Sequence, residues 1–65
     1  MYKYTCSLDA ARGLYENFTT FNNIRVYSEE LLTNKALKKE VAKFIPKEYY
    51  NLGVMKVDEM EVIYE

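Results

Sequence analysis

The chain has 65 residues, no histidine, no tryptophan, one cysteine and seven tyrosines, and its formal net charge is −1 at pH 7. The commonest general acid–base and the commonest metal ligand are therefore missing, and a lone cysteine cannot build a disulfide framework or a structural zinc site. This inventory argues against an enzyme, a cofactor and a metal site, and the length allows a single compact domain of residues 1–65 with a marginal core.

The first predicted element is a strand over residues 2–8. Its apolar face carries Tyr2, Tyr4, Cys6 and Leu8, and its polar face carries Lys3, Thr5 and Ser7. This period of two is typical of a half-buried strand. Cys6 has no histidine to activate it and no second cysteine to resolve it, so we interpret it as a small core residue rather than a nucleophile.

The next segment allows two interpretations. In the first, Ser7 or Asp9 caps a helix, although Gly13 would cost such a helix about 1 kcal/mol. The apolar stripe of this helix consists of Ala11, Leu14 and Phe18. In the second, residues 15–21 form a strand that turns at Asn22-Asn23, because asparagine tolerates the left-handed conformation of such turns. We predict the helix, followed by a short strand over residues 24–27.

A second helical region follows. Ser28 is predicted to cap it, and Thr33-Asn34 either breaks it or caps a further segment. From Lys35 onward one helix face is apolar, consisting of Leu37, Val41, Phe44 and Ile45. Pro46 is expected to end the helix at Ile45, and Gly53 is expected to close the following turn in a left-handed conformation.

The last predicted element is a strand over residues 54–64. Met60, Val62 and Tyr64 share one of its faces, and Glu59, Glu61, Ile63 and Glu65 share the other. The complete order is β-α-β-α-β. The sequence therefore predicts an α+β fold in which two helices pack on one face of a three-stranded sheet.

The seven tyrosines exceed what so small a core requires. Tyr49 and Tyr50 are adjacent and cannot both face one core, and tyrosine is enriched in protein interfaces. The predicted partner-binding residues are Tyr49, Tyr50, Met55, Met60, Glu61 and Tyr64. We predict a non-enzymatic interaction module, a regulator or inhibitor that binds a larger host protein. The composition, rich in Lys, Asn, Tyr and Ile, fits an accessory protein of a low-GC bacterium, phage or mobile element.

The alternative is a small nucleic-acid-binding protein. Its contacts would come from Lys35, Lys39, Lys43 and Lys47 on and after the second helix. Lysines so arranged can bind phosphates, but the isoelectric point of about 5.4 argues against this alternative. A homodimer is a further way to complete a marginal core.

The sequence also predicts a location. The N-terminal residues lack the apolar segment of a signal peptide, and the chain has no run of the roughly 20 apolar residues that a membrane span needs. A single free cysteine is typical of a reducing compartment. We therefore expect a cytoplasmic protein without a membrane partner.

Overall fold

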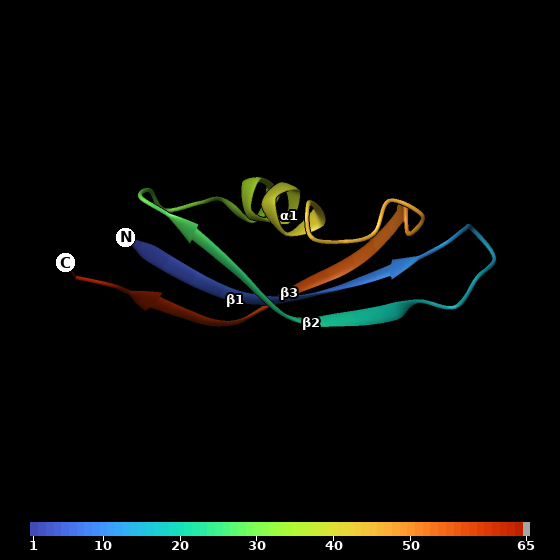
Figure 1. The fold of residues 1–65 in the computed structure, drawn as a ribbon, viewed down its shortest axis with the longest axis horizontal. Coiled ribbons are helices and arrows are strands. Elements are labelled where there is room, and N and C mark those ends of the chain that lie inside the picture. Colours follow the sequence, from blue (N-terminus) through green and yellow to red (C-terminus); the bar gives the residue numbers. More distant parts are fainter. Residues whose placement is uncertain (65) are drawn as a thin grey trace.

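The computed structural model describes residues 1–64, which form three strands and one helix. The strands are β1 (Tyr2–Ala11), β2 (Thr19–Ser28) and β3 (Asn51–Val62), and the helix is α1 (Asn34–Ala42). β1 lies in the middle of the sheet, antiparallel to β2 on one side and β3 on the other. The sheet is long and twisted, and α1 covers the middle of one face (Figure 1). We call this the helix face and the opposite one the open face.

The predicted arrangement of two helices in β-α-β-α-β order is wrong. Among residues 1–64 the elements follow the order β-β-α-β, with a single helix. Where the first helix was predicted, β1 continues to Ala11 and a loop of residues 12–18 leads into β2. Ala10 and Ala11 are fully buried and pair with Leu52 and Asn51 of β3. This pairing with a distant strand outweighs the local helical preference of alanine.

The alternative reading, a hairpin that turns at Asn22-Asn23, is also wrong because β2 passes through both residues. The register of β2 against β1 shifts between Cys6 and Leu8, so that Asn22 and Asn23 together lie opposite Ser7. Two residues opposite one make a β-bulge. Asn23 has a φ of 59°, so the left-handed tolerance of asparagine serves a bulge rather than a turn.

The backbone of Asn23 allows a direct test of this bulge. Asn23→Val is expected to destabilise the protein by about 1–2 kcal/mol, because a β-branched side chain is strained at positive φ. Asn23→Gly is expected to change the free energy of unfolding by less than about 0.5 kcal/mol, since glycine adopts this conformation readily. Urea unfolding of both variants measures the difference. Equal losses would show that the bulge conformation is not what the position requires.

The core forms between the helix face and α1. Its buried members are Tyr4, Cys6, Leu8, Ala10, Ile24, Val26, Leu37, Val41 and Ile45. The strand predicted over residues 2–8 is confirmed, with its apolar set turned to the core. The hydroxyl of Tyr4 accepts the backbone N–H of Leu32 at 3.0 Å, which gives this buried polar group the partner that it needs.

The helix predicted after Lys35 is confirmed, but it ends earlier than expected. Thr33 caps it, and its hydroxyl oxygen accepts the N–H of Ala36 at 3.1 Å. Leu37 and Val41 are buried against the sheet. Phe44, which was predicted for the core, is exposed. The reason is that α1 ends at Ala42, so the helical spacing no longer holds at position 44.

Two other predicted caps have different roles. Ser28 ends β2, and its hydroxyl accepts the N–H of Glu30 at 3.1 Å and donates to the Glu30 carbonyl at 2.8 Å, which makes a turn rather than a helix start. Gly53 lies inside β3 and does not adopt the left-handed conformation. Its carbonyl oxygen accepts the ammonium group of Lys38 at 2.8 Å. This bond ties α1 to β3.

The molecule is elongated, with extents of 44 × 16 × 16 Å. The N- and C-terminal segments lie side by side at one end (Figure 1), where the N–H of Ile63 donates to the carbonyl oxygen of Met1 at 2.8 Å. The loop between β1 and β2 and the loop between α1 and β3 lie at the other end. Among the described residues there is no helix with the length and apolar character that crossing a membrane requires.

Candidate protein-interaction surface

Two loops meet at the end of the molecule opposite the termini. One connects β1 to β2, and the other connects α1 to β3 (Figure 1). The side-chain amide of Asn51 donates to the carbonyl oxygen of Gly13 at 3.3 Å, and a Cβ atom at Gly13 would lie 3.6 Å from the Tyr50 hydroxyl. Residues that are far apart in the sequence therefore form one continuous end surface.

Large apolar side chains are exposed on these loops. Leu14 is 73% exposed, Tyr50 67% and Phe18 52%, and Tyr15 is fully exposed. We call these four residues, together with Arg12 and Tyr49, the aromatic end. Scattered exposed apolar residues are normal on a protein surface, but several gathered at one place mark a contact site.

A layer of packed side chains holds the aromatic end in place. Tyr49 is half-buried, and its ring meets that of Phe21 edge-to-face with centroids 5.1 Å apart. The guanidinium of Arg12 lies over the Tyr49 ring, 5.1 Å from its centroid. The Phe18 ring lies against Gly53 of β3, where a Cβ atom would come within 2.9 Å of it. Both loops are thereby fixed to the sheet.

The structure divides the predicted partner-binding residues among four places. Tyr49 and Tyr50 lie at the aromatic end. Met55 and Met60 lie on the helix face of β3, because they pair with the core residues Leu8 and Tyr4. Glu61 pairs with Lys3 on the open face, and Tyr64 follows β3 at the terminal end, where it is exposed. These six residues do not form one patch.

Sequence reasoning missed four members of the aromatic end, because Arg12 was not among the predicted partner-binding residues. Leu14 and Phe18 were assigned to the buried stripe of a helix, and Tyr15 to the same helix. The available signal was the loop-forming composition around them, with Gly13 before the segment and Asn17 within it. An apolar residue in such a loop has no strand or helix partner to cover it.

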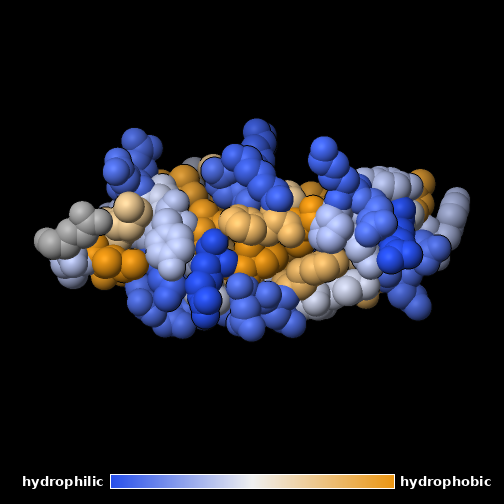
Figure 2. Space-filling view, in the orientation of Figure 1, coloured by the Kyte–Doolittle hydropathy of each residue, from blue (hydrophilic) through white to orange (hydrophobic). Residues whose placement is uncertain are grey.

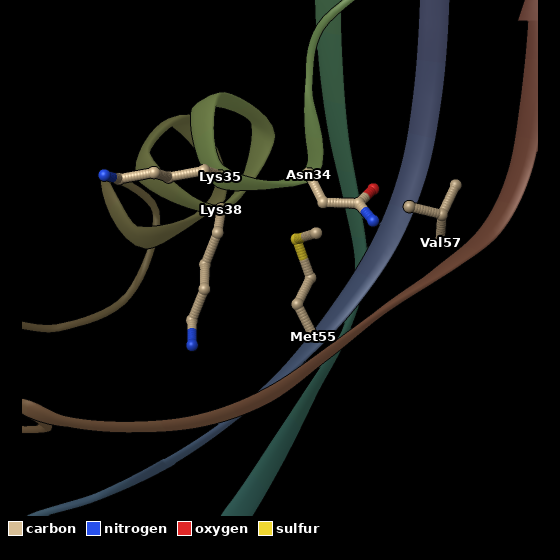
Figure 3. A pocket seen from close by; sticks show the side chains of 5 residues that line it. All are labelled: Asn34, Lys35, Lys38, Met55 and Val57. Atoms are coloured by element: carbon tan, nitrogen blue, oxygen red, sulfur yellow. The ribbon is translucent and has the colours of Figure 1, made fainter.

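A groove runs between α1 and β3. Its volume is about 570 Å³, and it is lined by Asn34, Lys35, Lys38, Met55 and Val57. In Figure 3 the side chains of Met55 and Val57 rise from β3, and Lys38 extends from α1 toward β3 beside Met55, whereas Lys35 points away from them. Figure 2 shows apolar surface along the middle of the molecule between rows of polar side chains. The groove therefore combines an apolar floor with a basic wall.

The lysines of the nucleic-acid alternative border different grooves. Lys35 and Lys39 border the grooves between α1 and β3. Lys43 forms an ion pair with Glu40 at 2.5 Å and lies beside Arg25 of β2. Lys47 lies in the loop after α1.

The acidic residues of β3 are close enough to influence one another. A hydrogen bond with Glu61 and then its negative charge raise the pKa of Glu59, while Lys3 and Arg25 act in the opposite direction. Glu59 pairs with Thr5 and Glu61 with Lys3, so both carboxylates lie on the open face. Burial, followed by the charge of Asp58, raises the pKa of the Cys6 thiol, which agrees with a core role for Cys6.

A polar hollow of about 310 Å³ lies on the open face, with Ser7 and Asp9 among its lining residues. Asp9 accepts the hydroxyl of Thr20 at 2.6 Å. Within residues 1–64 no three acidic, histidine or cysteine side chains converge as metal ligands. No protein-family model matches the chain, and no curated protein or solved structure shows a significant match to it.

Proposed function

We propose that the protein is a small interaction module that acts in the cytosol as a regulator or inhibitor, by docking its aromatic end onto a larger protein. The observation that carries this proposal is the exposure of Leu14, Tyr15, Phe18 and Tyr50 at one end of the molecule. Tyrosine and other large apolar side chains dominate binding energies because they bury much area with few rotatable bonds.

The packing behind these side chains favours tight binding. Association costs free energy when loops and side chains must be ordered at the interface. Here the stack of Arg12, Tyr49 and Phe21 and the bond from Asn51 to Gly13 already order both loops in the free protein. Less of the free energy gained by burying the aromatic end is then lost in ordering these loops.

The shape of the aromatic end indicates what kind of surface on the partner would bind it. A large aromatic side chain buries about 150–250 Å², whereas a standard interface buries about 800 Å² on each protein. The aromatic end belongs to a molecule only 16 Å across, so a flat surface would contact too little of it. A cleft that surrounds the tip would reach the required area. Occupying the cleft of a larger protein is a direct way to block it.

The test compares capture of partner proteins from a low-GC bacterial lysate by wild-type protein and by the Tyr15→Ala/Tyr50→Ala variant. Each hot-spot tyrosine contributes about 2 kcal/mol or more, so the double variant is expected to weaken binding at least a hundredfold. Both side chains are exposed, so the variant should unfold at nearly the wild-type temperature. Quantitative mass spectrometry reads the capture, and calorimetry with the purified partner gives the affinity.

The matched control is Tyr27→Ala/Tyr64→Ala, which removes two exposed tyrosines from other parts of the surface. This control should capture the same partner at the wild-type level. If both double variants lose the partner equally, the contact is not specific to the aromatic end. If neither loses it, the aromatic end is not the binding surface. Nuclease treatment of the lysate separates protein contacts from those bridged by nucleic acid.

A further inference from the structure

The outer edge of β3 is open to another strand. β3 has 12 residues and pairs with β1 on one side only, since the order in the described sheet is β2-β1-β3. At its start the carbonyl oxygen of Gly53 is occupied by Lys38. From Val54 onward the backbone groups along this edge can bind a second strand. A long open edge usually carries charged residues, a bulge or a covering element that blocks such pairing or restricts it to particular partners.

The helix face next to this edge is incompletely covered. α1 packs against β1 and β2, and the side chains of β3 on this face remain partly exposed. They are Leu52, Met55, Val57, Met60 and Val62. They share the helix face of β3 and so form an apolar row along the open edge, and Met55 and Val57 of this row line the groove beside α1 (Figure 3). A strand added to β3 would cover part of this row.

The charges along β3 are separated into two halves. The first half carries Lys56, and the lysines of α1 lie beside it, with Lys38 bound to the backbone of β3. The second half carries Asp58, Glu59 and Glu61 and no basic residue. An antiparallel two-fold pairing brings the first half of each strand against the second half of the other. The edge of β3 is therefore complementary in charge to itself.

We propose that a second copy of this chain binds along β3 and extends the sheet to six strands. In the register that matches both faces, Val57 meets Val57 of the second copy at the two-fold axis and Asp58 forms a bulge. Met55 then pairs with Met60 of the second copy on the helix face. Lys56 pairs with Glu59 of the second copy on the open face. Each of these two pairs occurs twice by symmetry.

This register uses features already present in the single chain. Asp58 is the extra residue of β3 against β1, where the register shifts between Thr5 and Cys6, so a bulge at this point needs no new distortion. The crowding that raises the pKa of Glu59 comes from Glu61. Lys56 of the second copy would place a cation at this pair of carboxylates and relieve their repulsion.

The test is a charge exchange followed by sedimentation equilibrium. Wild-type protein is expected to reach twice its chain mass of 7.7 kDa within a concentration range of about 1 µM to 1 mM. Lys56→Glu creates two like-charged pairs and should raise the dissociation constant at least about tenfold. Glu59→Lys alone should do the same. The double variant Lys56→Glu/Glu59→Lys restores both pairs and should return the constant to near the wild-type value.

Lys47→Glu is the control, because it changes the net charge as Lys56→Glu does but lies outside β3. A wild-type protein that stays monomeric over the whole range overturns the proposal. So does a double variant that dissociates as readily as the single ones, or a Lys47→Glu protein that dissociates equally. Far-UV circular dichroism checks that every variant retains the fold.

This proposal goes beyond the function of the aromatic end and stands independently of it. Lys56→Glu leaves Leu14, Tyr15, Phe18 and Tyr50 intact, and Tyr15→Ala/Tyr50→Ala leaves β3 intact. A failure of the dimer proposal therefore appears in the sedimentation of the wild-type protein and of the β3 charge variants. A failure of partner docking appears as wild-type capture by the tyrosine variant. Neither result can be mistaken for the other.

Discussion

Leu8→Ala is expected to unfold most of the protein at 37 °C or to bring it close to that point. Leu8 is completely buried at the centre of the core, between β1 and α1. Removing a buried leucine side chain costs about 2–5 kcal/mol, because apolar burial is lost and a cavity remains. A chain of this length has a free energy of unfolding of roughly 3–10 kcal/mol. Urea unfolding followed by circular dichroism measures the loss.

The matched control is Leu31→Ala. It makes the same chemical change at a leucine that is 66% exposed between β2 and α1. Its free energy of unfolding should stay within about 0.5 kcal/mol of the wild-type value. Similar losses in both variants would mean that Leu8 is not buried against α1 as the structure describes.

Gly53→Ala is expected to displace the Phe18 ring and to destabilise the protein by about 1–3 kcal/mol. The new Cβ atom would lie 2.9 Å from Cε1 of Phe18 and 3.2 Å from the Cβ of Asp9. Cβ atoms do not approach other atoms to 2.9 Å, so the ring must move, and at 3.2 Å the Cβ of Asp9 must give way by a few tenths of an ångström. Thermal unfolding gives the stability, and the NMR signals of the Phe18 ring report its displacement.

Two further variants decide the cause of this effect. Phe18→Ala/Gly53→Ala should recover part of the stability lost in Gly53→Ala, because the clashing ring is gone. Gly13→Ala should be nearly neutral, since the added Cβ would find only ordinary contacts, the nearest at 3.6 Å. If the double variant is less stable than Gly53→Ala, the loss comes from the backbone of β3 and not from Phe18.

The elements that depend on local pattern could be predicted from the sequence. The alternation from Tyr2 to Leu8 predicted β1, and the spacing of Leu37 and Val41 predicted α1. The secondary structure of the segment after Leu8 could not be predicted from its local pattern. The spacing of Ala11, Leu14 and Phe18 matches a helix, but pairing of β1 with β3 keeps Ala11 in a strand. Such pairing joins residues that no local window contains.

Only part of the candidate site could be predicted from the sequence, because the rest depends on the same pairing of distant strands. Adjacent tyrosines at positions 49 and 50 indicated an exposed ring, and Tyr50 is exposed. The members from the other loop were assigned to a core that the helix would have formed. Once that helix is absent, Leu14 and Tyr15 have no core to enter and lie at the tip. Because this helix was predicted wrongly, Leu14, Tyr15 and Phe18 were not recognised as surface residues.

The central position of β1 has a consequence for folding. β1 is the first strand to be synthesised, but its neighbour β3 is the last of the described elements, and their pairing extends as far as Met1 and Ile63. Contacts between the extremes of a chain slow folding, as in proteins of high contact order. On the ribosome the segment from the end of β2 to the end of β3 takes about 2–7 s to synthesise. Until β3 is available, one edge of β1 has no strand partner, so the sheet is completed only after nearly all of the described residues have been synthesised.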